Sequence, residues 1–269
     1  MVNVVVTGGS KGIGLGLAEE FLRRGANVAI AGRDANSLEA AVAKLRKLAC
    51  NDQQVTGHAC DVTDYLQVRA LWQLASSNFG KIDMWLNNAG LARTTWAIKD
   101  VPQGEVEAMV TTNMLGTING CRVAVDGMLA QGGVAKIFNI LGGGSDGEYF
   151  PGMGIYGTTK RGLDYFTNAL VKELKDTDII VGKIRPGMII TDAVIREAQE
   201  DMDNFQKSRK VMNNLVDKIE TVAPYLVEEM LKTTESGHKI AWLNGKKIGM
   251  RMLKARFRSR PDLFAEFGL

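Results

Sequence analysis

The chain has 269 residues, of which 45% are apolar and 23% are charged, and its formal net charge is +3 at pH 7. This composition is typical of a globular protein that can bury a substantial core. The charge is too small to indicate a nucleic-acid-binding protein, and no apolar run reaches the length that a membrane span needs.

Strand and helix patterns alternate from the first residues onward. The run NVVVTGG (3–9) predicts a buried parallel strand that glycine ends, and a helix with apolar residues at helical spacing follows as far as Gly25. A second strand is expected at 28–31, and Asn36 with Glu39 three residues later predicts a capping box at the start of the next helix. Further elements are expected at 54–62 (strand), 64–78 (helix) and 82–88 (strand).

The same alternation continues through the second half. Residues 186–218 interrupt it, because they are polar and poor in strand signal, and we expect a mobile loop region there that closes an apolar cover over a substrate. The other expected elements are a long helix (104–131), a strand (135–141), a helix that carries Tyr156, a strand (179–184), a helix (221–235) and a strand (239–243).

This order of elements predicts the fold class. Strict alternation indicates an α/β protein with a Rossmann-type, doubly wound parallel sheet of about seven strands and helices on both faces. The sequence shows no internal repeat or linker. We therefore predict a single dinucleotide-binding domain over residues 1–245, with a substrate-loop region at 186–218 and a C-terminal extension at 246–269.

A glycine-rich turn, TGGSKGIG (7–14), directly follows the first strand and opens a helix. Its glycines allow the backbone to approach a pyrophosphate, whose charge the helix N-terminus favours. Such a turn alone is weak evidence, but the strand–turn–helix context favours dinucleotide binding. The residues expected to contact the cofactor here are Gly8, Ser10, Lys11, Gly12, Ile13 and Gly14.

The end of the second strand indicates which dinucleotide is bound. An NAD-binding protein usually has an acid at this point, whereas this chain has Gly32 and Arg33, with Lys11 in the glycine-rich turn. Two cations near the ribose suit a 2′-phosphate and favour NADPH over NADH. The alternatives are that both cations are solvated surface charges, or that Asp34 turns toward the ribose.

Tyr156 and Lys160 lie four residues apart, on one face of a predicted helix. A phenol titrates near 10, so it shuttles protons poorly at neutral pH unless a cation favours its anion, and Lys160 would supply that cation. A tyrosine–lysine pair at this spacing is common on surface helices. Its meaning therefore depends on the other motifs.

Those motifs occur in a fixed order: TGGSKGIG, CDV (60–62), NNAG (87–90), Asn113, YGTTK (156–160) and RPGMIITD (185–192). With this set the chain resembles the short-chain dehydrogenase/reductase family over nearly its whole length. The resemblance implies that Tyr156 is the general acid, that Lys160 lowers its pKa and holds the nicotinamide ribose, and that Asn113 anchors a proton-relay water. It also implies cofactor contacts from Asp61, Val62, Asn88, Ala89, Gly90, Pro186, Gly187, Met188 and Thr191.

One position departs from the family pattern. The family usually has a serine thirteen residues before the tyrosine, where this chain has Gly143, and the nearest hydroxyl is that of Ser145. The segment GGGS and the tryptophan in IDMWLNNAG resemble the chlorophyll(ide) b reductase subset of the family. We predict that Ser145, or a backbone N–H of residues 142–144, orients the carbonyl oxygen, and that the three glycines leave room for a macrocycle.

The resemblance therefore implies NADPH-dependent reduction of a lipophilic carbonyl compound, with the C7 formyl group of chlorophyll b or chlorophyllide b as the expected substrate. A generic bacterial aldehyde or ketone reductase is one alternative. A second alternative is an NADP-binding sensor without turnover, which only the missing serine supports. A third, a basic protein that binds nucleic acid, lacks any reading motif.

Residues 246–260 are rich in lysine and arginine and hold no acid. Five apolar residues are interleaved with these cations: Ile248, Met250, Met252, Leu253 and Phe257. Such a segment either lies on an anionic membrane, near a lipophilic substrate, or packs on a partner subunit with its charges solvated.

Cysteines and histidines indicate the compartment. The three cysteines and two histidines match no metal, redox or disulfide spacing, so we predict no metal site and a reducing environment. No leader pattern precedes the first strand. The sequence thus predicts a cytoplasmic protein, peripheral to a membrane if its tail binds lipid, and the family resemblance implies a homodimer or homotetramer.

Overall fold

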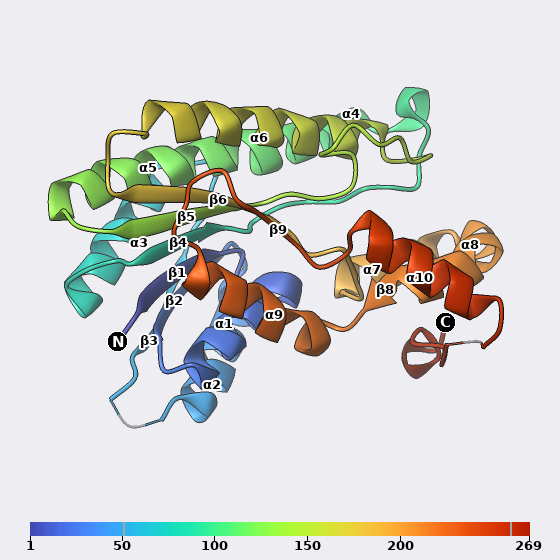
Figure 1. Ribbon diagram of the computed structural model, residues 1–269, viewed down its shortest axis with the longest axis horizontal. Helices are drawn as coiled ribbons and strands as arrows, with labels where there is room; N and C mark the ends of the chain where they lie inside the picture. Colours follow the sequence, from blue (N-terminus) through green and yellow to red (C-terminus); the bar gives the residue numbers. More distant parts are fainter. Residues whose placement is uncertain (51, 259) are drawn as a thin grey trace.

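A seven-stranded parallel sheet forms the centre of the structure, a computed structural model that describes residues 1–50, 52–258 and 260–269 (Figure 1). Its order is β3-β2-β1-β4-β5-β6-β9, which reverses between β1 and β4. In such sheets ligands bind at the carboxyl ends of the strands, beside the reversal. The strands are β1 (Asn3–Thr7), β2 (Asn27–Gly32), β3 (Val55–Ala59), β4 (Met84–Asn87), β5 (Ala135–Ile140), β6 (Ile179–Arg185) and β9 (Lys239–Ala241).

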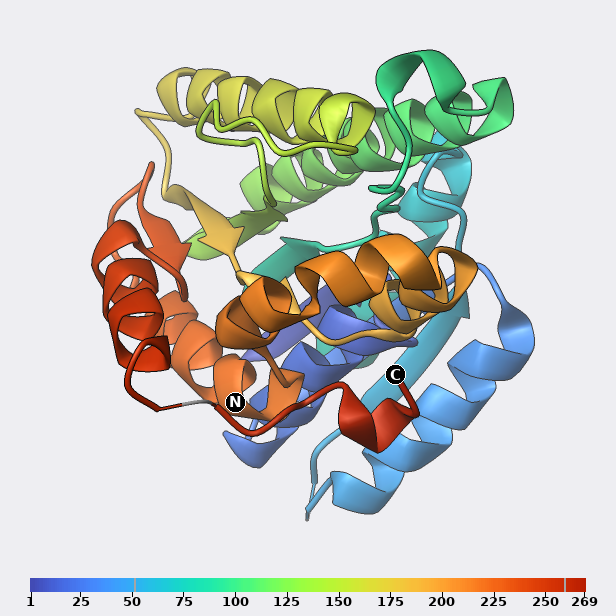
Figure 2. The same cartoon turned by 90° about the vertical axis from the view of Figure 1, so that its right-hand side faces the viewer.

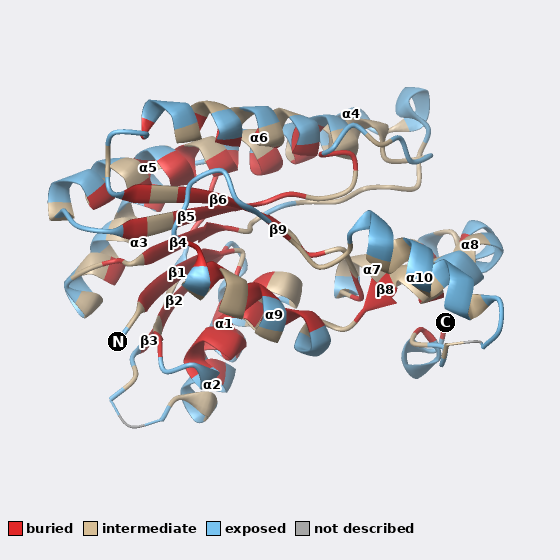
Figure 3. Cartoon of the chain, viewed as in Figure 1, coloured by how far each residue is buried: buried red, intermediate tan, exposed pale blue. Residues whose placement is uncertain are grey.

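Helices cover both faces of the sheet (Figure 1). One face carries α1 (Gly12–Arg23), α2 (Ala35–Leu48) and α9 (Ile219–Lys232), and the other carries α3 (Tyr65–Phe79), α5 (Gly116–Gln131) and α6 (Gly154–Glu173). Figure 3 shows the buried residues along the strands and on the inner sides of these helices. Phe21 of α1 and Trp85 of β4 are fully buried in the two separate apolar cores. The predicted fold class is confirmed.

The long helix expected at 104–131 is divided into three consecutive segments. They are α4 (Gln103–Met109), a π-helical turn η2 (Val110–Leu115) and α5, and a short 3-10 helix η1 (Ile98–Asp100) precedes them. Single π-turns inside helices are rare and occur often at functional sites. Here the π-turn contains Asn113, which is fully buried.

The sequence predicts a loop region at residues 186–218, and this prediction is wrong because these residues are largely helical. They form β7 (Met188–Ile189), α7 (Asp192–Glu200), α8 (Met202–Leu215) and β8 (Val216–Asp217), and β7 pairs with β8. Together with α10 (Gly245–Ala255) and the C-terminal tail, which includes the 3-10 helix η3 (Ala265–Phe267), they form what we call the outer lobe (residues 188–217 and 245–269). Figure 2 shows α8 in orange beside the red tail.

The outer lobe has its own small apolar core. Phe205 of α8 packs edge-on against Phe264 of the tail, with ring centroids 5.0 Å apart, and Ile190, Val216 and Leu269 are buried with them. Met188, Val194 and Ile195 pack against the same cluster. These residues therefore contribute to the core of the lobe, and the apolar cover over a substrate stays a prediction.

Asp217 joins the tail to the lobe. Its buried carboxylate accepts hydrogen bonds from Trp242 Nε1 (2.6 Å), Arg251 (2.8 Å) and Arg260 (2.6 Å). Two of the cations in residues 246–260, Arg251 and Arg260, are thus paired with an acid of the same chain. Ser259, in the same segment, lies outside the described residues. No helix in the described ranges is both long and apolar enough to cross a bilayer.

Candidate active site

The glycine-rich turn has the geometry of a phosphate cradle. Gly8 (φ 62°) and Gly12 (φ 53°) are in the left-handed region, and a Cβ added at Gly14 would overlap the carbonyl oxygen of Gly8. Lys11 stands at the N-cap of α1 and makes no side-chain capping bond. The first amides of α1 therefore have no capping side chain there, which is the arrangement that binds a phosphate.

The segment after β4 braces this turn. Asn88 Nδ2 donates to the carbonyl oxygens of Thr7 and Gly8, at 3.0 Å each, while Thr7 Oγ1 accepts from the amides of Asn88 (3.0 Å) and Ala89 (3.2 Å). A Cβ at Gly90 would lie 3.6 Å from Lys160 Nζ. The segment thus connects the glycine-rich turn to Lys160.

Two cations lie on the surface at the carboxyl end of β2, where Lys11 and Arg33 are both exposed. Asp34 is used elsewhere: it is the N-cap of α2, and its Oδ1 accepts from the amide of Ser37 at 2.8 Å. Hydrogen bonds from Ser37 hold the pKa of Asp34 below its usual value, with a smaller contribution from Lys11. The capping box predicted at Asn36 is therefore wrong. Asp34, the acid beside the expected ribose position, instead caps α2.

Asp61 and Val62 are fixed just beyond β3. Asp61 Oδ1 accepts from the amide (2.9 Å) and hydroxyl (2.8 Å) of Thr63, and Asn119 Nδ2 donates to the carbonyl oxygen of Val62 at 3.0 Å. The side chain of Val62 is buried. Both residues lie at the carboxyl edge of the sheet, beside the end of β2.

The segment from Pro186 to Thr191 reaches the same edge. Gly187 is in the left-handed region (φ 83°) and leads into Met188 of β7. Thr191 caps α7, and a Cβ at Gly12 would lie 3.2 Å from Thr191 Cγ2. The beginning of the outer lobe thus lies against the glycine-rich turn.

Tyr156 and Lys160 meet in the first turns of α6. Lys160 is 5% exposed, its Nζ donates to the carbonyl oxygen of Ile140 (2.9 Å), and this nitrogen lies 5.7 Å from the centroid of the Tyr156 ring. Burial lowers the pKa of Lys160 to about 8.

Burial has the largest effect on the pKa of Tyr156. Burial raises it to about 12, while Arg185 lowers it and Glu197 raises it by smaller amounts. Desolvation of the phenol thus dominates in the protein alone, and the lowering of this pKa by Lys160 stays a prediction. At neutral pH the hydroxyl is protonated and able to donate.

The side chain of Asn113 is fully used inside the protein. Its Oδ1 accepts from the amide of Leu91 (2.7 Å), and its Nδ2 donates to the carbonyl oxygen of Leu91 (2.9 Å) and to Thr159 Oγ1 (3.0 Å). It fastens the segment after β4 to α6, one residue before Lys160. The proton-relay role of Asn113 stays a prediction.

The three glycines before α6 allow close packing and leave no added space. A Cβ at Gly142 would overlap the hydroxyl of Tyr156, and one at Gly143 would lie 2.8 Å from Met153 Cε. Gly144 is in the left-handed region (φ 85°), and its Cβ would lie 2.6 Å from Gly157 Cα. The prediction that these glycines leave room for a macrocycle is therefore wrong, because Tyr156 and α6 occupy the space.

Ser145 is completely buried, and its Oγ has no hydrogen-bond partner among the described residues. Its carbonyl oxygen accepts from Arg161 at 3.0 Å. Gly142 and Gly143, by contrast, are partly exposed. Part of the chain next to Tyr156 therefore reaches the surface, whereas the Ser145 hydroxyl is enclosed in this conformation.

Two charged residues near Tyr156, Glu197 and Arg185, had not been expected from the sequence. Glu197 of α7 accepts from the amide (3.0 Å) and hydroxyl (2.6 Å) of Thr94, which ties the outer lobe to the loop after β4. Arg185 forms ion pairs with Asp146 and Glu148 and so holds the chain between Ser145 and α6. Their partners are distant in sequence, and no local pattern indicates these contacts.

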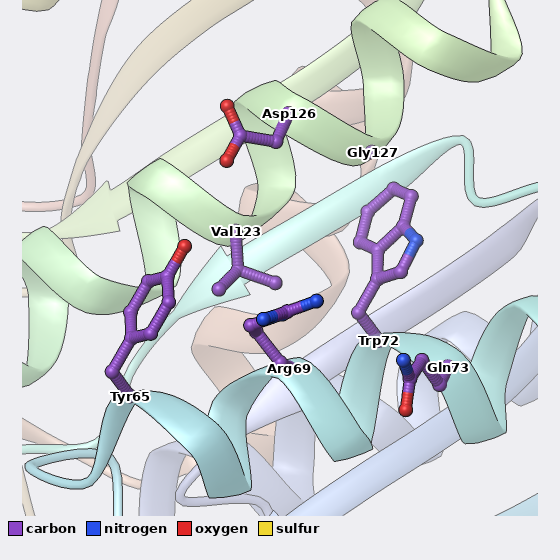
Figure 4. Close-up of a pocket in the computed structure, with 7 residues that line it drawn as sticks. All are labelled: Tyr65, Arg69, Trp72, Gln73, Val123, Asp126 and Gly127. Carbon is purple, nitrogen blue, oxygen red and sulfur yellow. The ribbon is translucent and has the colours of Figure 1, made fainter.

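A surface hollow of about 460 Å³ between α3 and α5 lies outside this site (Figure 4). Tyr65, Trp72 and Asp126 line it together with Arg69. It includes none of the residues that the sequence predicts for cofactor binding or catalysis.

Known proteins share both the sequence and the fold. Residues 2–202 match the family described as short chain dehydrogenase. Chlorophyll(ide) b reductase NOL, chloroplastic, of Arabidopsis thaliana is 37% identical over 241 residues, which cover 87% of this chain and 67% of the relative. Probable chlorophyll(ide) b reductase NYC1, chloroplastic, of the same plant is 30% identical over 270 residues, which cover 95% and 53%. The chain thus spans about half to two thirds of these relatives.

A solved structure shows the same arrangement. The short chain dehydrogenase from Burkholderia cenocepacia J2315, crystallised in complex with NADP, superposes with a TM-score of 0.75 and 25% identity. The superposition covers 89% of this chain and 95% of that one.

Proposed function

The chain belongs to the short-chain dehydrogenase family, and from that premise we propose that it reduces a carbonyl group with NADPH. The observation that carries the proposal is the position of the Tyr156 hydroxyl. It packs against the partly exposed Gly142, beside the buried Lys160, at the edge of the sheet that also holds the glycine-rich turn. The protonated phenol can act there as the general acid because the adjacent Lys160 cation would stabilise the phenolate that it leaves.

The residues present fit NADPH. The glycine-rich turn and the uncapped start of α1 would hold the pyrophosphate, and Lys11 and Arg33 would hold the 2′-phosphate. Asp34 is engaged with Ser37 and leaves these cations without a competing acid at the ribose. The structural relative in complex with NADP supports this choice. When bound, the cofactor supplies the hydride.

The choice of cofactor can be tested at Arg33. We expect Arg33→Asp to raise the Kd for NADPH by about tenfold or more and to change the Kd for NADH much less, because a charge-assisted hydrogen bond of ~1.5–3 kcal/mol becomes a repulsion. Lys175→Asp is a matched control, since Lys175 is exposed near the amino end of β6, at the opposite edge of the sheet. Both constants can be measured by fluorescence titration, and equal effects on the two cofactors would show that Arg33 does not reach the 2′-phosphate.

The chain's own residues then move the proton. Tyr156 donates its hydroxyl proton to the carbonyl oxygen, and the Lys160 ammonium stabilises the phenolate that remains. We further propose that the backbone amides of Gly142 and Gly143 orient the carbonyl oxygen, because they adjoin Tyr156 and are partly exposed. This assigns to the backbone the role that a serine side chain usually has in the family.

Ser145 provides the test of that assignment. Ser145→Ala removes a buried hydroxyl that has no partner among the described residues, so we expect Tm to stay the same or rise slightly and kcat to stay within about twofold. Thermal melting and steady-state kinetics measure both. If kcat instead fell by about tenfold or more with an unchanged affinity for NADPH, the hydroxyl would reach the substrate, as the sequence suggests.

We propose the C7 formyl group of chlorophyllide b, or of chlorophyll b, as the carbonyl. The support is the 37% identity to a chlorophyll(ide) b reductase, which extends over 87% of this chain. The competing function is a generic aldehyde or ketone reductase, which the same Tyr156 geometry would serve equally well. A cytoplasmic location and a homodimer or homotetramer stay predictions from the sequence.

The substrate is tested by incubating the protein with NADPH and chlorophyllide b and separating the pigments by chromatography. We expect a 7-hydroxymethyl product with the wild-type protein and none with Tyr156→Phe. A panel of simple aldehydes is assayed in parallel through the absorbance of NADPH. Brisk reduction of the simple aldehydes without any pigment product would refute the pigment assignment and leave the reductase standing.

A further inference from the structure

The outer side of α10 carries an exposed apolar stripe. Met250, Leu253 and Phe257 follow one another at spacings of three and four residues, so they lie on one side of the helix and of the turn that continues it. Their exposed fractions are 56%, 61% and 83%, and Phe257 is the most exposed large apolar side chain of the described residues. An apolar stripe of this kind normally faces a core or a partner.

Positive charge surrounds the stripe. Lys246, Lys254, Arg256 and Arg258 are exposed, and the sequence has no acidic residue from Asn244 to Pro261. A second copy of this surface would be repelled, because like charges would face each other. An anionic surface would be attracted, and the apolar side chains could then enter it.

The inner side of α10 is already fixed to the protein. Arg251 donates to Asp217 (2.8 Å) and to the carbonyl oxygen of Leu215 (3.2 Å), and Arg260 anchors the following segment to Asp217. The Lys247 ammonium lies over the ring of Trp242. The orientation of the helix is therefore set by contacts within the chain, and these contacts leave Met250, Leu253 and Phe257 exposed. Figure 3 shows much of α10 in the colour of exposed residues.

The position of the stripe adds a further argument. α10 lies beside α8 in the outer lobe, at the same end of the molecule as the carboxyl edge of the sheet (Figures 1 and 2). We propose that α10 and the turn after it, residues 245–258, dock the protein on an anionic lipid bilayer. Docking would hold the candidate active site near the membrane surface, where a lipophilic carbonyl compound would collect. The inference stands independently of the substrate proposed above.

The test is co-sedimentation of the full chain with vesicles of phosphatidylcholine, alone or mixed with phosphatidylglycerol. We expect binding to the mixed vesicles to be at least about tenfold tighter than to phosphatidylcholine alone, and to weaken as salt is added. The double variant Leu253→Ser, Phe257→Ser should lose at least about tenfold in affinity for the mixed vesicles. Tyr165→Ser, which alters a 77% exposed side chain of α6, is the matched control and should bind like the wild type.

Two results would overturn the proposal. One is equal binding of the wild type and the double variant, or no binding by either. The other is a wild-type oligomer in sedimentation velocity that the double variant loses, which would assign the stripe to a second copy of the chain. Reduction of a water-soluble aldehyde should be the same in both proteins, so a failure of docking is distinguishable from a failure of catalysis.

Discussion

We expect the Tyr156→Phe variant to lose about 10²–10⁴-fold in kcat while it binds NADPH as the wild type does. The substitution removes one oxygen and leaves the ring in place against Gly142 and near Lys160. Because burial raises the pKa of Tyr156 to about 12, the wild-type hydroxyl is protonated at neutral pH and holds the proton that the reaction needs. The loss should therefore appear in kcat and kcat/KM alike.

The matched control is Tyr165→Phe, which alters an exposed tyrosine on the same helix. Steady-state kinetics with a soluble aldehyde and fluorescence titration with NADPH measure the two quantities separately. If Tyr156→Phe kept nearly normal turnover, Tyr156 could not be the general acid.

Gly142→Ala is expected to have the second-largest effect. The new Cβ would overlap the Tyr156 hydroxyl, so the phenol or the backbone must move. A misplacement of about 1 Å in catalytic geometry costs roughly 10²-fold, and we expect a loss of that size in kcat. The affinity for NADPH should change little, because the glycine-rich turn lies at another point of the carboxyl edge of the sheet.

Gly143→Ala is the neighbouring control. Its Cβ would approach Met153 Cε, the end of a flexible side chain, at 2.8 Å, and its contacts with Met153 Sδ and Phe150 Cδ2 would be an ordinary 3.6 Å. We therefore expect kcat to fall by less than about threefold. Thermal melting of both variants shows whether each is folded. Wild-type kinetics in a folded Gly142→Ala variant would show that catalysis does not require the contact between Gly142 and Tyr156.

The sequence predicts the parts of this structure that depend on local patterns. The alternation of apolar strands and amphipathic helices predicts the sheet and both helical layers, because the spacing of apolar residues within each segment indicates a strand or a helix. The glycine-rich turn could be predicted because Gly8 and Gly12 need left-handed backbone and Gly14 needs the absence of a Cβ. These requirements are local, and so is the spacing of Tyr156 and Lys160.

The outer lobe could not be predicted in this way. Its helices α7 and α8 are polar, and the core that stabilises them is completed by Phe264 and Leu269 from the far end of the chain. Asp217 likewise finds Trp242, Arg251 and Arg260 through the fold. No pattern within residues 186–218 contains that information.

Burial of the active-site residues likewise could not be predicted from the sequence. The sequence identifies Ser145 as the nearest hydroxyl to the missing serine, but only the fold shows that this hydroxyl is enclosed while Gly142 and Gly143 are partly exposed. The raised pKa of Tyr156 is also a property of the fold, because desolvation outweighs the effect of Arg185. Spacing in the chain reveals which groups are neighbours and gives no measure of their burial.

Hydride transfer itself is the most direct test of the account. The wild-type protein is incubated with NADPH that carries deuterium at both C4 positions of the reduced nicotinamide, together with chlorophyllide b, and the pigment product is analysed by mass spectrometry. We predict one deuterium at the new hydroxymethyl carbon, and no product when Tyr156 is replaced by phenylalanine. A product without deuterium, or oxidation of the cofactor without reduction of the pigment, would contradict the proposed reaction.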